Sequence, residues 1–356
     1  MSYRDRTDAF CRRFGLRVPV LLAPMAGACP PELSAAVANA GGLGACGCLT
    51  LKPEAIAGWV AAVRGASNGA FQLNNWIPDP PPARDAEREA KVRAFLAGFG
   101  PEVPAEAGDA AILDFAAQCE VMLSAGPPII SSIMGLYPPE FVQRMKARGI
   151  AWFATATTVA EAVAAAAAGA DVIVAQGAEA GGHRGAFEPE RAQTALVGLF
   201  ALLPAIVDAV SLPVVATGGI ADGRTAAAAL ALGASAVQVG SGFLRCPEAG
   251  LNPAWAESLA TAQPEDTVVT RAFSGRPGRA LANAYARAAS APDAPEPAPY
   301  PVQRGLTAAM RAEAARAGDA ERMQAWAGQA ARLARAEPAG EAVARIWTEA
   351  QRLLAG

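Results

Sequence analysis

The sequence predicts an α/β protein built as a (β/α)8 TIM barrel, with a helical insertion and a C-terminal helical subdomain. Short apolar runs alternate with alanine-rich helical stretches, and eight such runs occur within the first part of the 356-residue chain. Runs without polar alternation are typical of strands buried on both faces of a parallel sheet. Eight such strands, alternating with helices over about 250 residues, indicate a closed barrel.

The expected strands are short and rich in Val, Ile, Leu and Ala. They cover residues 18–23, 43–47, 70–74, 129–134, 151–155, 171–175, 213–217 and 236–239. The helices expected between them include residues 31–40, 138–148, 159–168, 194–209 and 224–232. Strands and helices therefore follow one another in the order that a barrel requires.

Two stretches interrupt this alternation. Residues 77–126 begin with Pro78-Asp79-Pro80-Pro81-Pro82 and continue as charged helical sequence, which indicates a helical insertion after the third strand. Residues 247–356 carry further helices around a proline-rich segment, 292–301, which must be extended and semi-rigid. We expect residues 1–76 and 127–246 to form the barrel, and the insertion and the tail to pack over one of its faces.

Composition excludes several classes of function. The net charge is −3 and no strong basic patch occurs, which argues against nucleic-acid and anionic-membrane partners. The first six residues are too charged for a signal peptide. The longest apolar run, residues 195–207, is shorter than the roughly 20 residues that span a bilayer. We therefore expect a cytoplasmic protein, either a monomer or a homodimer.

The cysteine and histidine content argues against a metal site. The six cysteines show no metal-ligand spacing, and the chain has only one histidine. We expect the cysteines to be reduced and to behave as small apolar residues.

The single histidine, His183, lies in the run Gln176-Gly177-Ala178-Glu179-Ala180-Gly181-Gly182-His183-Arg184-Gly185. This run follows the sixth expected strand, and barrels carry their active sites at the C-terminal ends of their strands. Histidine exchanges protons near neutral pH, and glycine lets a ligand approach the main chain closely. A lone histidine often packs against backbone, but this context predicts a catalytic role for His183.

Glycines also follow the seventh and eighth expected strands, in Thr217-Gly218-Gly219-Ile220 and Gln238-Val239-Gly240-Ser241-Gly242. Turns of this kind direct backbone N–H groups and a helix N-terminus at a phosphate. No G-x-G-x-x-G follows the first strand, so a Rossmann dinucleotide site is not indicated.

Amide side chains stand at the ends of several expected strands: Asn74, Gln176 and Gln238. Such groups can donate to and accept from the edge of a planar heteroaromatic ring. Together with the phosphate turns, they suggest a planar cofactor with one phosphate. FMN fits this set, and a sugar phosphate fits it nearly as well.

Several motifs resemble those of the nitronate monooxygenases, once called 2-nitropropane dioxygenases, which are FMN-dependent barrels. They are Ala23-Pro24-Met25-Ala26-Gly27, the Asn74 turn, Thr155-Ala156-Thr157-Thr158, the run from Gln176 to Gly185, Ala216-Thr217-Gly218-Gly219-Ile220, Gln238-Val239-Gly240-Ser241, Phe273-Ser274-Gly275-Arg276-Pro277-Gly278-Arg279, Pro299-Tyr300-Pro301 and Trp326-Ala327-Gly328-Gln329. The resemblance covers almost the whole chain, and the glycine–histidine run is its most specific part.

The resemblance implies a set of site residues. FMN would be held by Met25, Gly27, Asn74, Gln176, Gly181, Gly182, Gly218, Gly219, Gln238, Val239, Gly240 and Ser241. His183 would lie over the flavin and face the substrate. Tyr300 matches a position in the substrate channel, although a tyrosine between prolines is often a packing residue. No metal is implied.

The resemblance also implies a reaction. The family oxidises alkyl nitronates, such as propionate 3-nitronate, with O2 to a carbonyl compound and nitrite through a flavin semiquinone. A protonated His183 would attract the nitronate anion, whereas a neutral one would take the α-proton of a nitroalkane. Glu179 would either orient His183 or cap a helix.

Two alternatives stay open. NADH:quinone reductases and flavin-type enoyl-acyl-carrier-protein reductases share the glycine–histidine turn, so an NAD(P)H-dependent flavin reductase is the first. The quinone-reductase branch typically has a lysine near the end of strand five, where this chain has Ala154-Thr155-Ala156-Thr157. A flavin- or phosphate-binding barrel without turnover is the second.

Overall fold

Eight parallel strands form a barrel in the computed structural model, which describes residues 2–355. The strands are β1 (Val20–Leu22), β2 (Gly44–Gly47), β3 (Phe71–Trp76), β4 (Ile129–Ile133), β5 (Ala151–Ala156), β6 (Val172–Gln176), β8 (Val214–Thr217) and β9 (Ala236–Val239). Their order is β1-β9-β8-β6-β5-β4-β3-β2, and the ring closes where the Leu22 N–H donates to the Leu43 carbonyl. The predicted fold class is confirmed.

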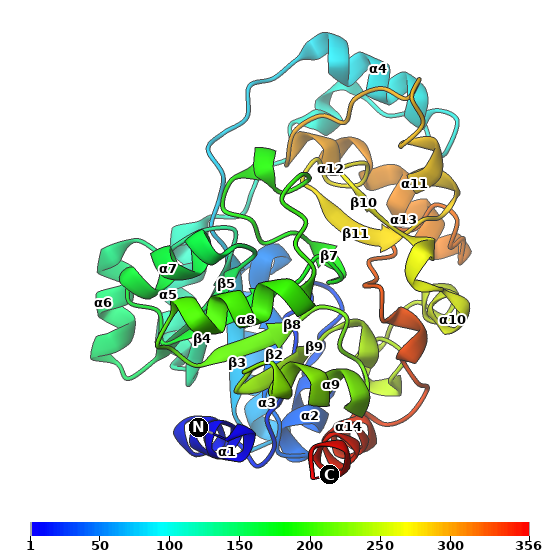
Figure 1. Cartoon of the computed structure of the whole chain (residues 1–356). Coiled ribbons are helices and arrows are strands. Elements are labelled where there is room, and N and C mark those ends of the chain that lie inside the picture. The colour runs from blue at the N-terminus through cyan, green and yellow to red at the C-terminus, as the bar shows by residue number, and fades with distance from the viewer. Residues whose placement is uncertain (1, 356) are drawn as a thin grey trace.

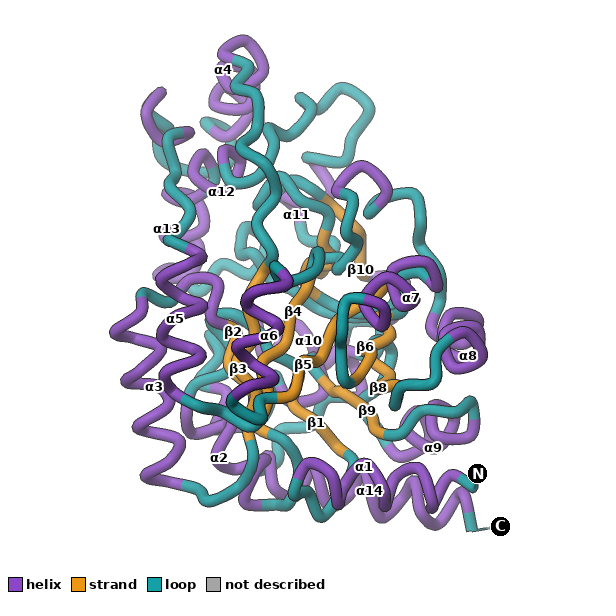
Figure 2. The backbone as a smooth tube through the Cα atoms, turned by 90° about the vertical axis from the view of Figure 1, so that its left-hand side faces the viewer, coloured by secondary structure: helices purple, strands orange, loops and turns teal. Residues whose placement is uncertain are grey.

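Helices surround this barrel, as Figure 2 shows with the strands in orange. They are α2 (Pro31–Asn39), α3 (Pro53–Ala66), α5 (Phe115–Ala125), α6 (Pro139–Ala147), α7 (Val159–Ala167), α8 (Leu199–Ala209), α9 (Gly223–Ala231) and α14 (Ala339–Leu354). The helix expected from residue 194 begins only at Leu199, because Gly198 is extended and serves as its N-cap. No helix within residues 2–355 has the length and apolar character needed to cross a membrane.

One helix that the sequence patterns did not predict closes the N-terminal end of the barrel. It is α1 (Tyr3–Phe14), which begins with a capping box between Ser2 and Asp5. Phe10 and Phe14 are buried, and their rings lie 6.1 Å and 4.9 Å from the ring of Phe153 on β5. The bottom of the barrel is therefore sealed by aromatic packing, and ligands reach only the opposite end.

A subdomain covers that opposite end, at the top of Figure 1. It contains α4 (Ala86–Leu96) from the insertion, followed later in the chain by α10 (Pro253–Thr261), α11 (Ala284–Ala288), α12 (Val302–Leu306) and α13 (Ala308–Ala317). It also contains an antiparallel sheet, not predicted from the sequence, of β10 (Thr267–Thr270), β11 (Gly278–Leu281) and β7 (Gly182–His183). Because β7 carries His183, this residue follows a barrel strand, β6, and pairs with a subdomain strand, β11.

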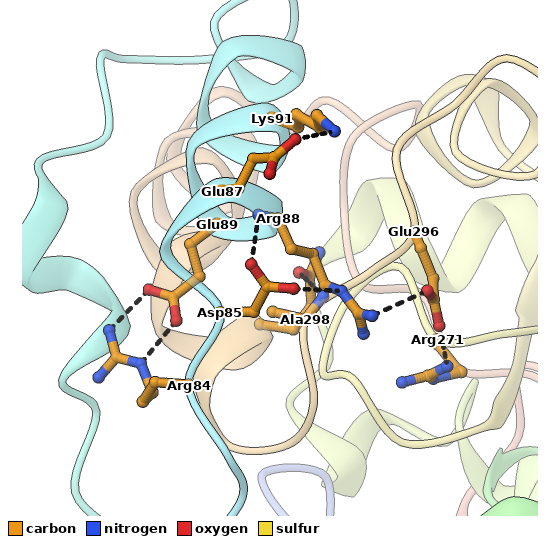
Figure 3. A network of polar contacts seen from close by, with 10 residues as sticks. Arg84, Asp85, Glu87, Arg88, Glu89, Lys91, Arg271, Glu296 and Ala298 are labelled. Atoms are coloured by element: carbon orange, nitrogen blue, oxygen red, sulfur yellow. Dashed lines mark hydrogen bonds and ion pairs between the residues drawn. The ribbon is translucent and has the colours of Figure 1, made fainter.

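The insertion is attached to the tail mainly by apolar packing. Val92 and Leu96 of α4 share a buried cluster with Phe273, Tyr285 and other tail residues. Glu296, in the proline-rich segment, adds ion pairs with Arg88 (3.1 Å) and Arg271 (3.3 Å), as Figure 3 shows. Glu296 is exposed and the two arginines are partly exposed, and such pairs contribute about 0–1 kcal/mol each, so the apolar cluster dominates.

The domain limits expected from the sequence stay a prediction. The last helix, α14, lies at the bottom of Figure 1, far from the subdomain, and packs against α9 and α2 of the barrel. We therefore propose that residues 339–354 belong to the barrel, although they come at the end of the tail.

Candidate functional site

A cavity of about 430 Å³ lies at the C-terminal ends of the barrel strands. Its walls come from the loops after β1, β2, β8 and β9 and from residues of the subdomain such as Arg304 and Trp326. Sites for small ligands and cofactors generally occupy about 300–1,000 Å³. The size and position are those of an active site in a TIM barrel.

Most of the residues predicted for the site line this cavity. They are His183 together with Met25, Gly27, Asn74, Gln176, Gly181, Gly182, Gly218, Gly219, Gln238, Gly240 and Ser241. The strand ends therefore bring together side chains that lie more than 200 residues apart in the chain.

Two predicted residues, Val239 and Tyr300, do not line the cavity. The Val239 side chain is fully buried in the barrel's main apolar cluster, and the Val239 carbonyl accepts from the Ala23 N–H. The Tyr300 ring lies behind Trp76, with 5.2 Å between the ring centroids, and Trp76 itself lines the cavity. Tyr300 thus supports the wall, and its contact with a substrate stays a prediction.

His183 is held on several sides. Its Nε2 lies 2.7 Å from the Ser274 hydroxyl, and the rings of Trp76 and Trp326 meet it nearly edge-on at 4.6 Å and 4.7 Å. Its backbone pairs with Gly278 of β11, and its carbonyl accepts from Gln176 Nε2 at 3.2 Å. The imidazole is therefore fixed in position before any ligand binds.

The environment keeps His183 neutral. Burial, and then the positive charges of Arg276 and Arg304, lower its pKa from the usual value to about 3. Of the two roles expected for this residue, proton acceptance requires the neutral form and anion attraction requires the charged form. The lowered pKa disfavours the charged form that anion attraction requires, and it leaves the neutral form that can accept a proton.

Ser274 decides which imidazole nitrogen carries the proton. Its hydroxyl lies 3.1 Å from the Arg276 carbonyl, which can accept the only hydrogen that a hydroxyl has. When Ser274 donates there, His183 Nε2 must donate to Ser274, and Nδ1 keeps its lone pair. This arrangement leaves Nδ1 as the basic atom.

Glu179 caps a helix. Its two carboxylate oxygens lie 2.9 Å and 3.0 Å from the backbone nitrogen of Leu199, the first residue of α8. A carboxylate at a helix N-terminus is stabilised by the helix dipole and by the free N–H groups. The helix cap, and not the orientation of His183, is the role that its hydrogen bonds support.

A glycine turn follows β8 at the edge of the cavity. Gly218 and Gly219 adopt φ values of +107° and +70°, which only glycine adopts without strain. Within residues 2–355 their N–H groups donate to no acceptor. The chain then enters α9, where the Asp222 and Glu349 carboxylates accept from the N–H groups of Thr225 and Gly223, so the donors left for a ligand are those of Gly218 and Gly219.

The amides at the strand ends are only partly used by the protein. Asn74 donates from Nδ2 to the Ser131 hydroxyl, and Gln238 accepts at Oε1 from Gln72. Among the described residues, Asn74 Oδ1 and Gln238 Nε2 have no partner. Gln176, by contrast, uses both ends of its amide on the backbone of His183 and Gly185, so it also shapes the histidine loop.

Several cavity residues were not predicted from the sequence. Trp76, Arg304, Arg311 and Gln324 line the cavity, and Ser274 contacts His183. Trp76 follows Asn74 closely, so the end of the third strand did carry a signal. Arg304, Arg311 and Gln324 lie in a tail without strand periodicity, and only the fold brings them to the site.

A buried ion pair joins three loops around His183. Arg276, which is 1% exposed, contacts both carboxylate oxygens of Asp79 and donates to the Ala186 carbonyl. Each of the three groups lies on a loop that also carries a residue at the imidazole. Asp79 is three residues after Trp76, Ala186 is three after His183, and Arg276 is two after Ser274. This pair therefore fixes the position of the imidazole relative to Trp76 and Ser274, which contact it.

Comparison with known proteins gives a consistent result. The family model described as "Nitronate monooxygenase" matches residues 10–349. A protein named nitronate monooxygenase from Pseudomonas aeruginosa is 40% identical over 94% of this chain and 97% of its own length. Among solved structures, a nitroalkane oxidase from Streptomyces ansochromogenes is 36% identical with a TM-score of 0.87, covering 97% of this chain and 98% of its own. A structure of FabK from Thermotoga maritima is 27% identical with a TM-score of 0.75, covering 98% of this chain and 97% of its own.

The matches extend over the barrel and the subdomain alike, so they include both walls of the cavity and the loop that carries His183. On this basis the chain belongs to the nitronate monooxygenase family.

Proposed function

We propose that this chain uses FMN to oxidise alkyl nitronates, such as propionate 3-nitronate, with O2, yielding a carbonyl compound and nitrite. The observation that supports the proposal is that a neutral His183 lines the same cavity as the Gly218 and Gly219 N–H groups, which have no acceptor within residues 2–355. The family to which the chain belongs supports the same reaction class. We further propose that it acts in the cytoplasm as a monomer or homodimer.

The residues of the cavity fit FMN. The N–H groups of Gly218 and Gly219, with Gly240 and Ser241, would hold the phosphate, and Asn74 Oδ1 and Gln238 Nε2 would meet the polar edge of the ring system. A Cβ added to Gly27, which also lines the cavity, would meet no protein atom within 4 Å, so space for a ring is kept there. When bound, FMN supplies the acceptor that takes electrons from the nitronate one at a time and passes them to O2.

The protein's own residues bind and orient the substrate and remove its α-proton. His183 Nδ1 takes the α-proton of a neutral nitroalkane, which converts it to the nitronate. The Trp76 and Trp326 rings surround the imidazole and exclude water from its faces. A substrate that is already a nitronate needs no proton removal and depends on His183 only for position.

An anaerobic titration separates the candidate functions. We expect the purified protein, loaded with FMN, to be yellow, and its flavin absorbance to change in a one-electron step with propionate 3-nitronate but not with NADH or NADPH. Rapid bleaching by NADH or NADPH would instead assign an NAD(P)H-dependent flavin reductase. A protein that cannot be loaded with FMN would support a binding barrel without turnover.

A further inference from the structure

Two guanidinium groups on the subdomain side of the cavity have no carboxylate partner. Arg304, on α12, and Arg311, on α13, both line the cavity. Within residues 2–355 neither forms an ion pair, whereas Arg276 nearby is paired with Asp79. Two positive charges therefore border the cavity without a counter-charge.

Neutral acceptors hold Arg311 in place. Arg311 donates to the Thr307 hydroxyl (3.1 Å), to the Gln324 side-chain oxygen (2.9 Å) and to the Arg304 carbonyl (2.8 Å). The Arg304 guanidinium lies near Tyr300, where its positive charge partly offsets the rise in the Tyr300 pKa that burial causes. Each guanidinium has five N–H donors, so both retain free donors after these bonds are made.

The charges of the two groups act on each other. Burial, and then the like charge of Arg304, lower the pKa of Arg311 to about 10. Like charges that act on one another at a partly desolvated wall are unfavourable without an anion. A ligand anion between them would remove this repulsion.

Two carboxylates in this region, those of Asp79 and Glu179, are already engaged. Both oxygens of Asp79 contact Arg276, and both oxygens of Glu179, which lines the same cavity, face the Leu199 N–H. Neither can serve as the counter-charge without breaking those contacts. The anion must therefore come from the ligand.

The arginine pair belongs to the same space as the reacting residue. Arg304 lies close enough to His183 for its charge to lower the pKa of the imidazole, and both side chains line one cavity. The free N–H groups of Gly218 and Gly219 already provide a place for a cofactor phosphate. The arginines are thus available to a second anion, on the substrate.

We propose that Arg304 and Arg311 form a carboxylate-binding site that makes this chain select nitronates bearing a carboxylate over alkyl nitronates of the same shape. The planar guanidinium matches a carboxylate through paired hydrogen bonds, which an alkyl group cannot replace. This inference rests on the proposed function and assigns its specificity to two residues of the subdomain.

A matched pair of substrates tests the site. Propionate 3-nitronate and 3-methylbutyl nitronate have the same chain length and branching, and differ by a carboxylate in place of an isopropyl group. In the FMN-loaded enzyme we expect kcat/KM to favour the carboxylate. Arg304→Gln should reduce kcat/KM for propionate 3-nitronate about 10- to 100-fold, the scale of a lost charged hydrogen bond, and leave 3-methylbutyl nitronate within about twofold.

Controls separate charge from folding. Arg304→Lys should retain part of the preference, and Arg316→Gln, at an exposed arginine on α13 outside the cavity, should leave it unchanged. FMN content should be the same in all variants. Equal losses on both substrates in Arg304→Gln, or loss of FMN from it, would overturn the proposal, because the arginine would then serve the fold or the cofactor.

The test also distinguishes this inference from the reaction on which it rests. If neither nitronate supports O2 uptake, the proposed function fails. The carboxylate site is then tested alone, by measuring the binding of 3-nitropropionate to the wild-type protein and to Arg304→Gln by calorimetry. Binding that weakens about tenfold or more in Arg304→Gln would still support a carboxylate site. Binding of equal strength in both proteins would reject it.

Discussion

The two walls of the cavity are built differently. The barrel wall presents glycine turns and neutral amides at the ends of parallel strands, so backbone geometry fixes its donors. The subdomain wall presents arginines, an aromatic ring and Gln324 from loops and short helices. We propose from this difference that the barrel wall holds the cofactor and that the subdomain wall selects the substrate.

His183 lies where the two walls meet. Its backbone follows β6 of the barrel and pairs with β11 of the subdomain, and its side chain contacts Ser274 from the subdomain. Substitutions on the two sides should therefore have different effects. Some should lower the free energy of unfolding, and others should lower kcat for a nitroalkane.

The largest effect is expected from the buried ion pair that joins the loops. Asp79→Asn leaves Arg276 buried without a counter-charge, and breaking a buried pair costs about 3–5 kcal/mol. We expect the free energy of unfolding in urea to fall by about 3 kcal/mol, since Asp79 is only partly buried. Glu296→Gln, in the exposed network of Figure 3, should cost under 1 kcal/mol. Equal losses in the two variants would show that the buried pair has no special role.

The next effect concerns the base itself. His183→Asn removes the proton acceptor but keeps a polar side chain, so FMN should stay bound while nitroalkane turnover falls by roughly 10²-fold or more. Turnover of a preformed nitronate should fall much less, because it needs no deprotonation. Unchanged nitroalkane turnover, measured as O2 uptake, would make the histidine a structural residue.

The pH dependence follows from the lowered pKa. A base with a pKa of about 3 stays unprotonated from pH 5 to pH 8. Protonation of His183 should therefore not lower kcat for a nitroalkane in that range. The folded state disfavours protonated His183, so its contribution to stability is present above the unfolded pKa of about 6.5 and is lost as pH falls toward 3. A kcat profile that drops with a pKa near 6.5, and does so only when His183 is present, would contradict this environment.

A smaller effect is expected at Ser274, which comes from the subdomain. Ser274→Ala leaves the His183 proton without its partner, and nitroalkane kcat should fall about tenfold, as expected when one neutral hydrogen bond is lost. KM should change little, because Ser274 is not among the residues that line the cavity. A change in KM with kcat intact would instead place Ser274 in substrate binding.

The smallest effect belongs to the barrel side, at Glu179. Glu179→Gln removes a charged cap from α8 and should lower the free energy of unfolding by about 1 kcal/mol. Because the glutamine still carries an oxygen acceptor, kcat for nitroalkane should stay within about twofold. A tenfold loss of kcat without a change in stability would restore the alternative that Glu179 orients His183.

Much of the barrel side could be predicted because its signals are local. Buried parallel strands give continuous apolar runs, and their ends in a closed barrel must meet, so the sequence alone was enough to group Asn74, Gln238 and Gly219 at one site. Two strands end at the residues expected from the sequence: β8 ends at Thr217 and β9 ends at Val239. The Val239 side chain lies in the core, so a contact with a cofactor could come only from its backbone, and this contact stays a prediction.

The subdomain side could not be predicted in the same way. β7, β10 and β11 are short, and their pairing is decided by contacts between distant segments and not by local periodicity. Arg304 and Arg311 carry no pattern that distinguishes them from exposed arginines, and only their packing against the cavity reveals them. Ser274 was part of a recognised motif, but its contact with His183 needed the three-dimensional fold.

Steady-state O2 uptake by the FMN-loaded protein tests the central claim most directly, with propionate 3-nitronate, 3-nitropropionate and NADH or NADPH supplied separately and nitrite measured alongside. We predict O2 uptake with nitrite release for the nitronate, slower uptake for the nitroalkane, and none for the nicotinamides. Uptake driven by NADH or NADPH, with no nitrite from either nitro compound, would contradict the account.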